Sequence, residues 1–379
     1  MPASRRTRWI CLCLVLLAGA GFTGCGRQPD DTAPSGNEAA SPASSASPVG
    51  RAEYERLLAA ASGTELSVPA LAELAADAED RIEARMDSVA ARIEPADDWR
   101  PVFDAIRRDH PPTVEEVLAA YQEEVAAAAD YLAGRDWVTL PPEPPRVVDA
   151  QSPIVRRSFS LALYMNGSLG VVTGPAEGDD PDYLANHCRV CIPPLAVHEA
   201  YPGHHVAFYH SAIARQGLVL GDRVSIQGRP ENFFFHEGWG LDAELMMLDA
   251  GYYRDPAREL AAWRMVLLRA VRARLDALLH AGEIRPEEAT AVYEEGLLMD
   301  SQAAATEVRR HLERPPSKAT YFVGLLQIQA LRRQALAAEP GLEPRVFHDR
   351  LLRRPRQVPA VAREEFGLEL TELAPLDLN

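Results

Sequence analysis

The sequence has little positive charge and almost no lysine. Its 379 residues include 39 Lys and Arg against 55 Asp and Glu, which gives a formal net charge of −16, and Lys318 is the only lysine. A protein that binds nucleic acid or anionic lipid headgroups needs a basic surface, because phosphate groups attract Lys and Arg. The charge balance therefore argues against nucleic acid as a partner and is typical of a well-solvated acidic surface.

The sequence also lacks an apolar run long enough for a comfortable membrane span. The run from Trp9 to Ala20 follows three arginines and precedes small residues, which is typical of a secretory signal peptide over residues 1–24. The next residues, Phe22-Thr23-Gly24-Cys25, resemble a bacterial lipobox; an ordinary signal peptide with a stray cysteine is the alternative. The lipobox implies that Cys25 is acylated and that lipid anchors the exported protein in the cell envelope. Because Gly26 replaces the retention aspartate, a host with two membranes would carry it on the outer membrane, facing the periplasm.

Large apolar residues are scarce between Arg27 and Gly50, where Ala, Ser, Pro and Gly dominate. Such a segment cannot bury enough apolar surface to offset the entropy lost on ordering. Residues 25–50 are therefore predicted to form a disordered tether. Residues 51–379 suffice for one large domain or two closely packed ones, which we divide into an N-terminal helical part, 51–150, and a part with the motifs below, 151–379.

Cysteine is scarce beyond the predicted signal peptide and lipobox. Cys188 and Cys191 form a single Cys-x-x-Cys, whereas a zinc ribbon would need a second pair. In an exported protein we expect a disulfide or two unreactive thiols. A redox role is the minor alternative, because no thioredoxin-like βαβ pattern surrounds the pair.

Helical periodicity dominates the rest of the chain. The N-terminal part predicts helices near 57–61, 71–93 and 114–132, with helix starts at Ser67 and at Thr113, where Glu116 completes a capping box. Alternating apolar residues on both sides of Asn166-Gly167, a type I′ turn signal, predict a β-hairpin. Further helices are predicted at about 196–215, 231–250, 255–281, 286–313, 318–338 and 344–353.

One stretch carries the strongest chemical signal: His198-Glu199-Ala200-Tyr201-Pro202-Gly203-His204-His205. A His-Glu pair on a helix opens a zinc-hydrolase motif in which His binds the metal and Glu is the general base. The usual second histidine, four residues later, is replaced by Pro202. On a straight helix His204 would lie roughly 9 Å along the axis on the wrong side, and His205 roughly 10.5 Å along on the right side. Neither could share zinc with His198, because Zn–N bonds are about 2.0–2.1 Å long.

Pro202 predicts that the helix bulges at this point. Proline has no N–H, and its ring clashes with the carbonyl four residues back, that of His198. Gly203 then gives the backbone freedom to resume the helix. If two residues loop out, His204 becomes the second ligand, which is the alternative we favour; if three do, His205 takes that place.

This stretch and Glu237-Gly238-Trp239-Gly240-Leu241-Asp242-Ala243-Glu244 together resemble the bacterial family known as domain of unknown function 885. Shorter matches lie at residues 307–311, 321–324 and 347–349. The family is similar to helical zinc peptidases such as carboxypeptidase Taq and thimet oligopeptidase. The resemblance implies a mainly α, multi-helix zincin-like metallopeptidase fold with a small β-hairpin or sheet near the active-site helix. In such relatives a strand beside the zinc helix pairs with substrate backbone, although a hairpin that only covers the core is equally compatible with the pattern.

The resemblance also implies the metal ligands. Glu237 would complete a site for one zinc ion with His198 and His204. Glu244 lies two turns further on the same helical face, where it would face the site or support a ligand. Trp239 would pack near the metal or serve as a core aromatic.

Catalytic roles follow from the resemblance and from residue type. Zinc would lower the pKa of a bound water, and Glu199 would take its proton. Tyr321 is the first candidate to stabilise the oxyanion, with His311 and His280 behind it. Arg310 could hold a substrate carboxylate through a bidentate pair.

Four residues at three places depart from the family pattern: Ser317 with Lys318, Asp242 and His311. They leave the metal ligands intact but weaken the assignment of substrate contacts. The leading prediction is a lipid-anchored zinc metallopeptidase that acts on peptides, with trimming from the C-terminus as one mode. The alternatives are a non-catalytic zinc-binding or scaffold lipoprotein and a zinc hydrolase of another amide or ester; the sequence predicts no oligomeric state.

Overall fold

The computed structural model describes residues 47–158, 161–165, 167–175, 182–216, 230–370 and 372–378. By its contacts the chain divides into Met1–Ala43 and Ser44–Asn379, and every described residue belongs to the second unit. The predicted signal peptide, Cys25 and nearly all of the predicted tether lie outside the described residues. Within the described ranges, no helix has both the length and the hydropathy needed to cross a bilayer.

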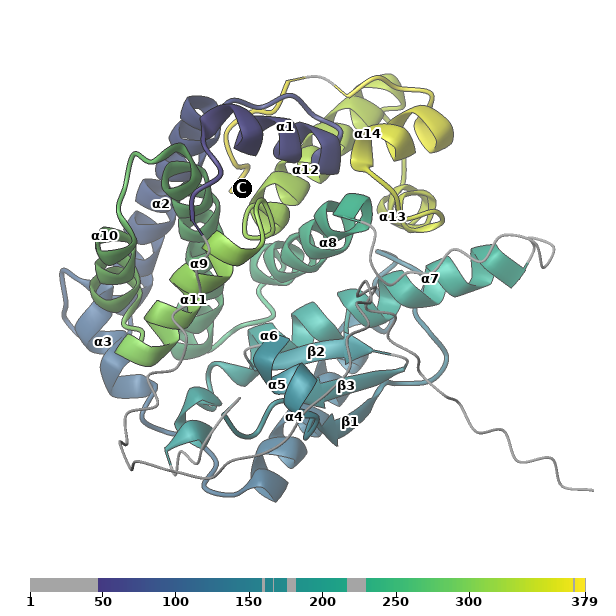
Figure 1. The fold of residues 1–379 in the computed structure, drawn as a ribbon. Coiled ribbons are helices and arrows are strands. Elements are labelled where there is room, and N and C mark those ends of the chain that lie inside the picture. The colour runs from purple at the N-terminus through teal and green to yellow at the C-terminus, as the bar shows by residue number, and fades with distance from the viewer. Residues whose placement is uncertain are drawn as a thin grey trace, which may run out of the picture. The chain divides into compact units, whose positions relative to one another are not determined.

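Helices make up most of the described chain, as Figure 1 shows. The N-terminal part contains α1 (Arg51–Ser62), α2 (Val68–Ala90), α3 (Trp99–Ile106) and α4 (Val114–Leu132). The remainder contains α5 (Pro153–Ser158), α6 (Ile192–Glu199), α7 (His204–Gln216), α8 (Pro230–Asp249), α9 (Pro256–Ala281), α10 (Pro286–Ala291), α11 (Ser301–Glu313), α12 (Thr320–Ala338), α13 (Pro344–Leu352) and α14 (Val358–Val361). The mainly helical fold predicted from periodicity is confirmed.

Two helices begin where the sequence predicts, at residues whose side chains cap the helix. The Ser67 hydroxyl accepts a hydrogen bond from the Ala70 amide at 3.3 Å, and the Thr113 hydroxyl accepts one from the Glu116 amide at 3.2 Å. These caps satisfy amides that have no partner inside their helices. Helix α3, a short helix whose buried face includes Trp99 and Phe103, was not predicted from the sequence.

The single helix predicted over 286–313 is wrong. The chain leaves α10 through a π-helical turn at Val292–Gly296, and α11 begins only at Ser301. Leu298 adopts a positive φ of 54°, which no helix interior accommodates. The Asp300 side chain then caps the new helix by accepting from the Ala303 amide at 2.8 Å. A proper N-cap thus outweighs the continuing apolar periodicity.

A small sheet lies beside α6. Its strands are β1 (Arg146–Asp149), β2 (Ala162–Met165) and β3 (Ser168–Val171), in the order β1-β3-β2. β2 and β3 form the predicted antiparallel hairpin, with Met165 opposite Ser168. β1 pairs with β3 in parallel, which the sequence did not predict. β2 is consequently an edge strand, and it packs against α6.

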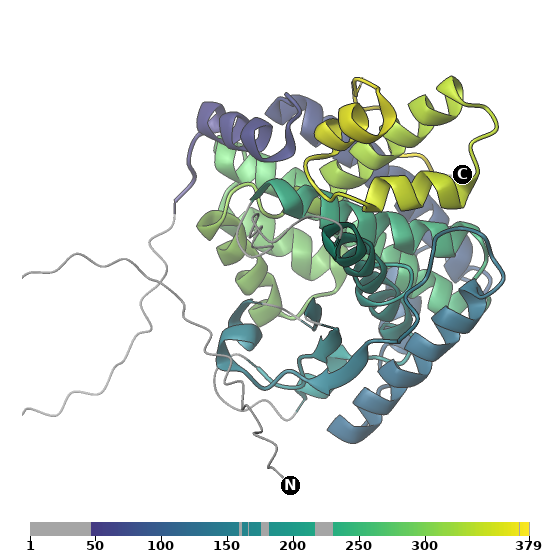
Figure 2. The same cartoon turned by 90° about the vertical axis from the view of Figure 1, so that its right-hand side faces the viewer.

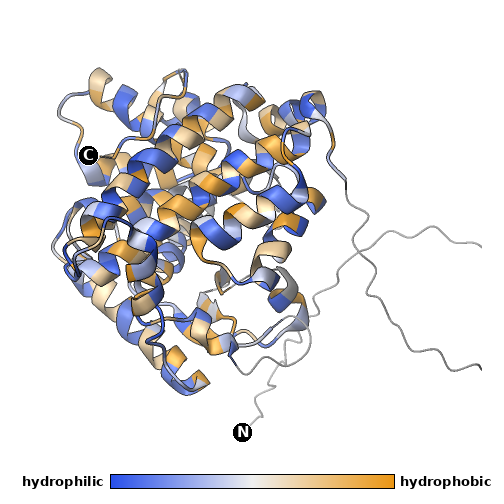
Figure 3. Cartoon of the chain, turned by 90° about the vertical axis from the view of Figure 1, so that its left-hand side faces the viewer, coloured by the Kyte–Doolittle hydropathy of each residue, from blue (hydrophilic) through white to orange (hydrophobic). Residues whose placement is uncertain are grey.

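Two apolar cores fill the domain, and α8 and α12 contribute to both. Phe234 of α8 and Phe322 of α12 belong to the core formed with α2 and α9. Trp239 of α8 and Ile328 of α12 belong to the core formed with α4, the sheet and α6. Figure 3 shows the corresponding alternation of apolar and polar residues along the helices. The candidate site therefore lies on helices anchored from two sides.

The α8 and α12 helices touch through glycines. A Cβ on Gly238 would lie 2.4 Å from the carbonyl carbon of Gly324, and one on Gly324 would lie 1.9 Å from the carbonyl oxygen of Phe234. No side chain fits at either position without separating the helices. This contact fixes Tyr321, near the start of α12, relative to the glutamates of α8.

The C-terminal segment closes back on the first helices. Gln357, just before α14, donates to the carbonyl oxygens of Ala60 and Ala61 at the end of α1. Arg81 of α2 donates to the carbonyl oxygen of Leu376 at 2.8 Å. Figures 1 and 2 both show α1 beside the C-terminal helices, drawn in yellow.

Candidate metal centre

The helix that carries His198 is interrupted where Pro202 predicts an interruption. α6 ends at Glu199 and α7 begins at His204. The Gly203 amide donates to the carbonyl oxygen of Val197 at 3.1 Å, which folds the break tightly against α6. A Cβ on Gly203 would lie 1.9 Å from the carbonyl oxygen of His198. Gly203 is thus required because the two backbone segments approach closely, and not only for the backbone freedom predicted from the sequence.

Trp239 of α8 holds this break in place. Its indole N–H lies 3.0 Å from the carbonyl oxygen of Pro202 and 3.1 Å from that of Gly203. The side chain is fully buried, so these contacts are shielded from water. Trp239 is thus a core aromatic, one of the two alternatives that the sequence left open. It also ties α8 to the segment that joins the two histidines, which the sequence did not predict.

The break brings two histidines and a glutamate of α8 together. The imidazole centroids of His198 and His204 are 4.6 Å apart. Oε2 of Glu237 lies 3.2 Å from Nε2 of His198 and 3.5 Å from Nε2 of His204. Donors bonded to one tetrahedral zinc at about 2.0–2.1 Å are about 3.4 Å apart, so these separations fit a shared ion.

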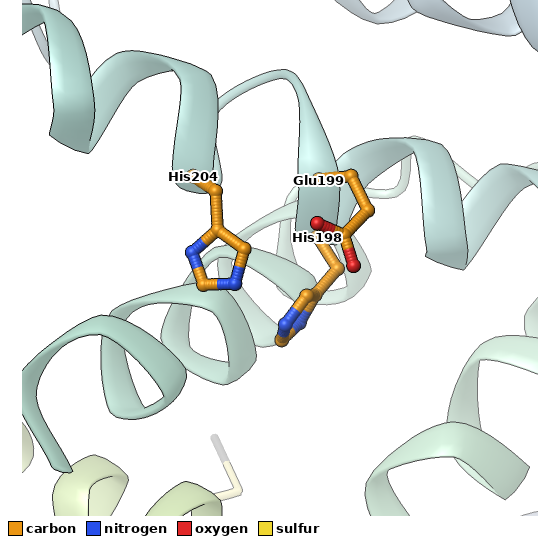
Figure 4. Close-up of side chains that lie close together, drawn as sticks. All are labelled: His198, Glu199 and His204. Atoms are coloured by element: carbon orange, nitrogen blue, oxygen red, sulfur yellow. The ribbon is translucent and has the colours of Figure 1, made fainter. Parts of the chain in front are cut away.

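Glu199 lies in the same cluster. Ligand atoms of His198, Glu199 and His204 are all within 4.8 Å of one another, and the three residues are buried. Figure 4 shows the two imidazoles turned toward each other with the Glu199 carboxylate beside them. Oε2 of Glu199 and Nδ1 of His204 are buried without a hydrogen-bond partner in the described part of the chain. Such a His-Glu-His cluster could hold a metal ion.

His205 faces away from this cluster. Its Nδ1 lies 2.9 Å from the hydroxyl of Tyr164 on β2, and its Nε2 lies 2.9 Å from the carbonyl oxygen of Glu143. Both ring nitrogens are therefore occupied by the sheet and the segment before it. Of the two alternatives that the sequence left open, the structure brings His204 to His198.

Glu244 supports His198 from behind. Its Oε1 lies 2.7 Å from Nδ1 of His198 and 3.3 Å from a terminal nitrogen of Arg269. A carboxylate on the second nitrogen of a metal-binding histidine fixes the tautomer and the orientation of the ring. Gly240 lets α8 approach the same ring, because a Cβ there would lie 2.4 Å from Cε1 of His198.

The buried charges of the cluster favour a cation. Burial acts to lower the pKa of His198, but hydrogen bonds to Glu237 and Glu244 outweigh it and raise the pKa to about 10. Burial acts to raise the pKa of Glu237, but hydrogen bonds from His198 and His204 outweigh it and lower the pKa. The carboxylates of Glu199, Glu237 and Glu244 thus lie together, where Arg269 and a protonated His198 balance two of their charges. A metal-binding histidine is neutral, so in the metal-bound state the three carboxylates would exceed the charge of Arg269 by two, which a divalent ion would balance.

Tyr321 borders the cluster. Its ring centroid lies 5.9 Å from that of His198, and the Arg269 and Arg272 guanidinium carbons lie 5.3 and 5.8 Å from the Tyr321 ring. The side chain is partly exposed. Of the three groups proposed to stabilise an oxyanion, this one stands next to the histidines.

His311 and His280 belong to a buried polar network instead. Nδ1 of His311 lies 2.6 Å from Asp276, and its Nε2 lies 2.7 Å from the Tyr293 hydroxyl. Nε2 of His280 donates to the carbonyl oxygen of His311 at 2.9 Å. Both rings are fully buried, and their contacts are those of a structural core. The structure does not bring them to the metal cluster.

Two other sequence features have structural explanations. Asp242 is buried and forms a two-pronged ion pair with Arg332, with Nη1 3.0 Å from Oδ1. This departure from the family pattern is thus an ion pair between α8 and α12. Cys188 and Cys191 form a disulfide just before α6, one of the two states expected for the pair.

Comparisons with known proteins identify a family and related folds, and they indicate no activity for this chain. The chain belongs to the family described as "Bacterial protein of unknown function (DUF885)", whose model matches residues 29–354. No curated protein matches the chain.

Two solved structures share the fold. A candidate lipoprotein of unknown function from Shewanella oneidensis is 19% identical with a TM-score of 0.69, over 83% of this chain and 59% of that one. A candidate lipoprotein from Colwellia psychrerythraea is 20% identical with a TM-score of 0.69, over 84% of this chain and 56% of that one. This chain thus spans less than two thirds of either relative.

Proposed function

We propose that this protein is a zinc-dependent metallopeptidase with a zincin-like helical fold. The observation that carries the proposal is the position of Oε2 of Glu237, 3.2 Å from Nε2 of His198 and 3.5 Å from Nε2 of His204, which matches two edges of a zinc tetrahedron. Three such ligands leave the fourth position of the ion for water. The buried carboxylate of Glu199, with one oxygen unpartnered among the described residues, stands beside them. Three ligands, an open position and an adjacent base are the parts of a hydrolytic zinc site.

Each residue then has a definite task. Zinc held by His198, His204 and Glu237 would supply Lewis-acid chemistry, which makes water acidic near neutral pH and polarises a carbonyl group. Glu199 accepts a proton from the attacking water and returns it to the leaving amine. The Tyr321 hydroxyl donates a hydrogen bond to the oxyanion. Glu244 keeps the His198 ring in the ligating orientation.

The sheet supports a peptide as substrate. Among the described strands, β2 lies at the edge of the sheet and packs against α6. An extended peptide can add to such an edge through its own backbone hydrogen bonds. Tyr164 of β2 also contacts His205, which places the strand against the segment that holds the metal ligands. This arrangement favours a peptide over a small ester or amide.

The proposal is tested by zinc content and peptide cleavage. We expect the purified domain, residues 51–379, to contain about one zinc ion per chain and to cleave members of a broad peptide library. A chelator is expected to abolish cleavage, and added zinc to restore it. Cleavage that persists after the metal is removed would refute the metal mechanism. Zinc binding without cleavage of any peptide would favour a non-catalytic zinc-binding protein.

We also propose that Cys25 carries the lipid anchor and that residues 26–50 are a tether. The lipobox-like sequence supports this, as does the likeness to two candidate lipoproteins. Mass spectrometry of the protein extracted from its native envelope is expected to show a mature N-terminus at Cys25 with acyl chains attached. A mature form that starts elsewhere and carries no lipid would contradict the anchor.

A further inference from the structure

A group of buried cations lies beside the candidate metal centre. Nε of Arg272 and Nζ of Lys318, the only lysine of the chain, lie 2.8 and 2.9 Å from the same oxygen, Oε2, of Glu307. Nη1 of Arg310 lies 3.4 Å from the other oxygen. Even without Arg310, which has further interactions, two cations share one carboxylate. We call Arg272, Lys318 and Glu307 the cationic cluster.

The cationic cluster is costly for a purely structural element. The side chains of Arg272, Lys318 and Glu307 are 10%, 12% and 5% exposed, so little water screens the second positive charge. Burial lowers the pKa of Lys318 to about 8, and repulsion from Arg272 acts in the same direction. A buried cation without a counter-charge destabilises the fold, so one cation beside Glu307 would leave the fold more stable than two.

The cluster retains donors for an anion. Arg272 contacts Glu307 through Nε, and within the described ranges neither of its terminal nitrogens has a hydrogen bond. Two terminal guanidinium nitrogens match the two oxygens of a carboxylate. Lys318 and Tyr321 are partly exposed, as is Glu237 of the metal cluster. The donors therefore lie close to groups that a ligand can reach.

The cationic cluster and the metal cluster are close enough to contact one peptide. The Arg272 guanidinium carbon lies 5.8 Å from the Tyr321 ring, which lies 5.9 Å from the His198 ring. The guanidinium is therefore at most about 12 Å from the imidazole, a span of about three extended residues or fewer at about 3.3–3.6 Å per residue. A peptide whose scissile carbonyl is at the metal would thus place a nearby carboxylate at Arg272.

Charge balance points the same way. With His198 neutral, as a metal ligand must be, the carboxylates of Glu199, Glu237 and Glu244 exceed the charge of Arg269 by two. A divalent ion bound by His198, His204 and Glu237 would cancel that excess and leave no surplus negative charge near the cationic cluster. The metal-loaded protein would then hold an uncompensated positive charge next to the reaction site. An anionic group of the substrate can balance it.

We propose that Arg272 and Lys318 bind the free C-terminal carboxylate of the peptide, so that the enzyme removes one to three residues from the C-terminus. This inference rests on the proposed peptidase function and specifies its substrate class. Carboxylate recognition is the chemistry at issue, and an acidic side chain near the scissile bond is the other source of that group. The experiment below separates the two sources.

Binding to a variant with its base removed tests the inference without turnover. The probes are three N-acetylated pentapeptides: a neutral peptide with a free C-terminal carboxylate, its C-terminal amide, and an amide with Asp at the last position. Calorimetry on zinc-loaded Glu199→Gln protein is expected to show the free acid binding at least tenfold more tightly than either amide. Adding Lys318→Met, which keeps most of the unbranched side chain and removes the charge, is expected to weaken binding of the acid at least tenfold and to leave binding of the amides unchanged.

Arg274→Met is the matched control. Arg274 lies on the same helix as Arg272 and pairs with Glu79 at 2.7 Å, so its loss removes a comparable ion pair elsewhere. In the Glu199→Gln background we expect this variant to retain the preference for the free acid. Zinc content and Tm are measured for each protein, so that a folding defect is recognised.

Each remaining outcome has a definite meaning. Equal binding of acid and amide by the parent would overturn the inference, and so would equal losses for acid and amide with Lys318→Met. Binding of the Asp amide as tightly as the free acid would assign the cationic cluster to a side chain instead. Zinc-dependent cleavage of amides as fast as free acids would leave the peptidase proposal standing and refute this inference. If the free acid bound selectively but the parent enzyme cleaved no peptide, carboxylate recognition would stand and the peptidase proposal would be refuted.

Discussion

Replacement of Glu199 by Gln is expected to leave zinc bound and to slow peptide hydrolysis by roughly a hundredfold or more, the scale of a lost general base. Glutamine keeps the shape and hydrogen bonding of the side chain but cannot accept a proton at neutral pH. Glu199 is 7% exposed, and burial raises its pKa against the opposing effect of His204 and His198. A raised pKa suits a base that must take up and return a proton near neutrality. Elemental analysis and steady-state kinetics on one peptide measure both effects.

Glu124→Gln is the control for this experiment. Glu124 of α4 is also buried, and it is paired with Arg258 at 2.5 Å, far from the candidate site in the sequence. Its loss tests whether any buried glutamate is needed for activity through stability alone. Parent-like cleavage by Glu199→Gln would show that the proposed mechanism is wrong. If both the parent and the variant bind zinc and neither cleaves any peptide, the result would favour a non-catalytic zinc-binding protein.

The sequence predicted features that depend on local chemistry. Ser67 and Thr113 cap helices through hydroxyls only three residues from the amides they satisfy. The Asn166-Gly167 signal predicted the observed hairpin, in which Gly167, just before β3, has a φ of 78°. Pro202 marks the interruption between α6 and α7, because a proline affects the carbonyl four residues before it.

The sequence did not predict the contacts between segments that are far apart along the chain. The indole of Trp239 holds the carbonyls of Pro202 and Gly203, and nothing in the local pattern distinguishes it from any other core tryptophan. The contact between Gly238 and Gly324 depends on how α8 meets α12. For His311 the error was the opposite one: the sequence suggested a role in catalysis that its contacts in the core do not support. A histidine in a motif-like segment suggested catalysis, whereas Asp276 and Tyr293 occupy both of its nitrogens within the core.

Lys318 shows why composition alone is a weak guide. A chain with one lysine is most simply explained by a preference for arginine in its composition. The structure places this lysine on the Glu307 oxygen that Arg272 also contacts. An ammonium is a compact point charge that differs from a guanidinium in shape and hydration. The position of Lys318, rather than its rarity, makes it a candidate for substrate binding.

Alanine at each proposed ligand is expected to remove zinc selectively. His198→Ala, His204→Ala and Glu237→Ala should each weaken zinc binding by more than the roughly 10- to 100-fold that loss of an outer-sphere partner costs, a range we expect for Glu244→Gln. The reason is geometric: three donors define a face of the zinc tetrahedron and two do not, and the Glu237 oxygen lies 3.2 and 3.5 Å from the two histidine nitrogens. Competition with a coloured chelator measures each affinity.

His205→Ala is the decisive comparison, because it changes the neighbouring histidine and leaves the proposed ligands intact. Its loss removes contacts to the Tyr164 hydroxyl and the Glu143 carbonyl, so we expect a lower Tm with zinc affinity close to that of the parent. His204→Ala should show the opposite result, since its Nε2 faces Glu237 and its Nδ1 has no hydrogen bond to lose within the described residues. Full zinc occupancy in His204→Ala together with loss in His205→Ala would move the ligand to His205. It would also require α7 to begin differently, because the ring of His205 now faces the sheet across the break from His198.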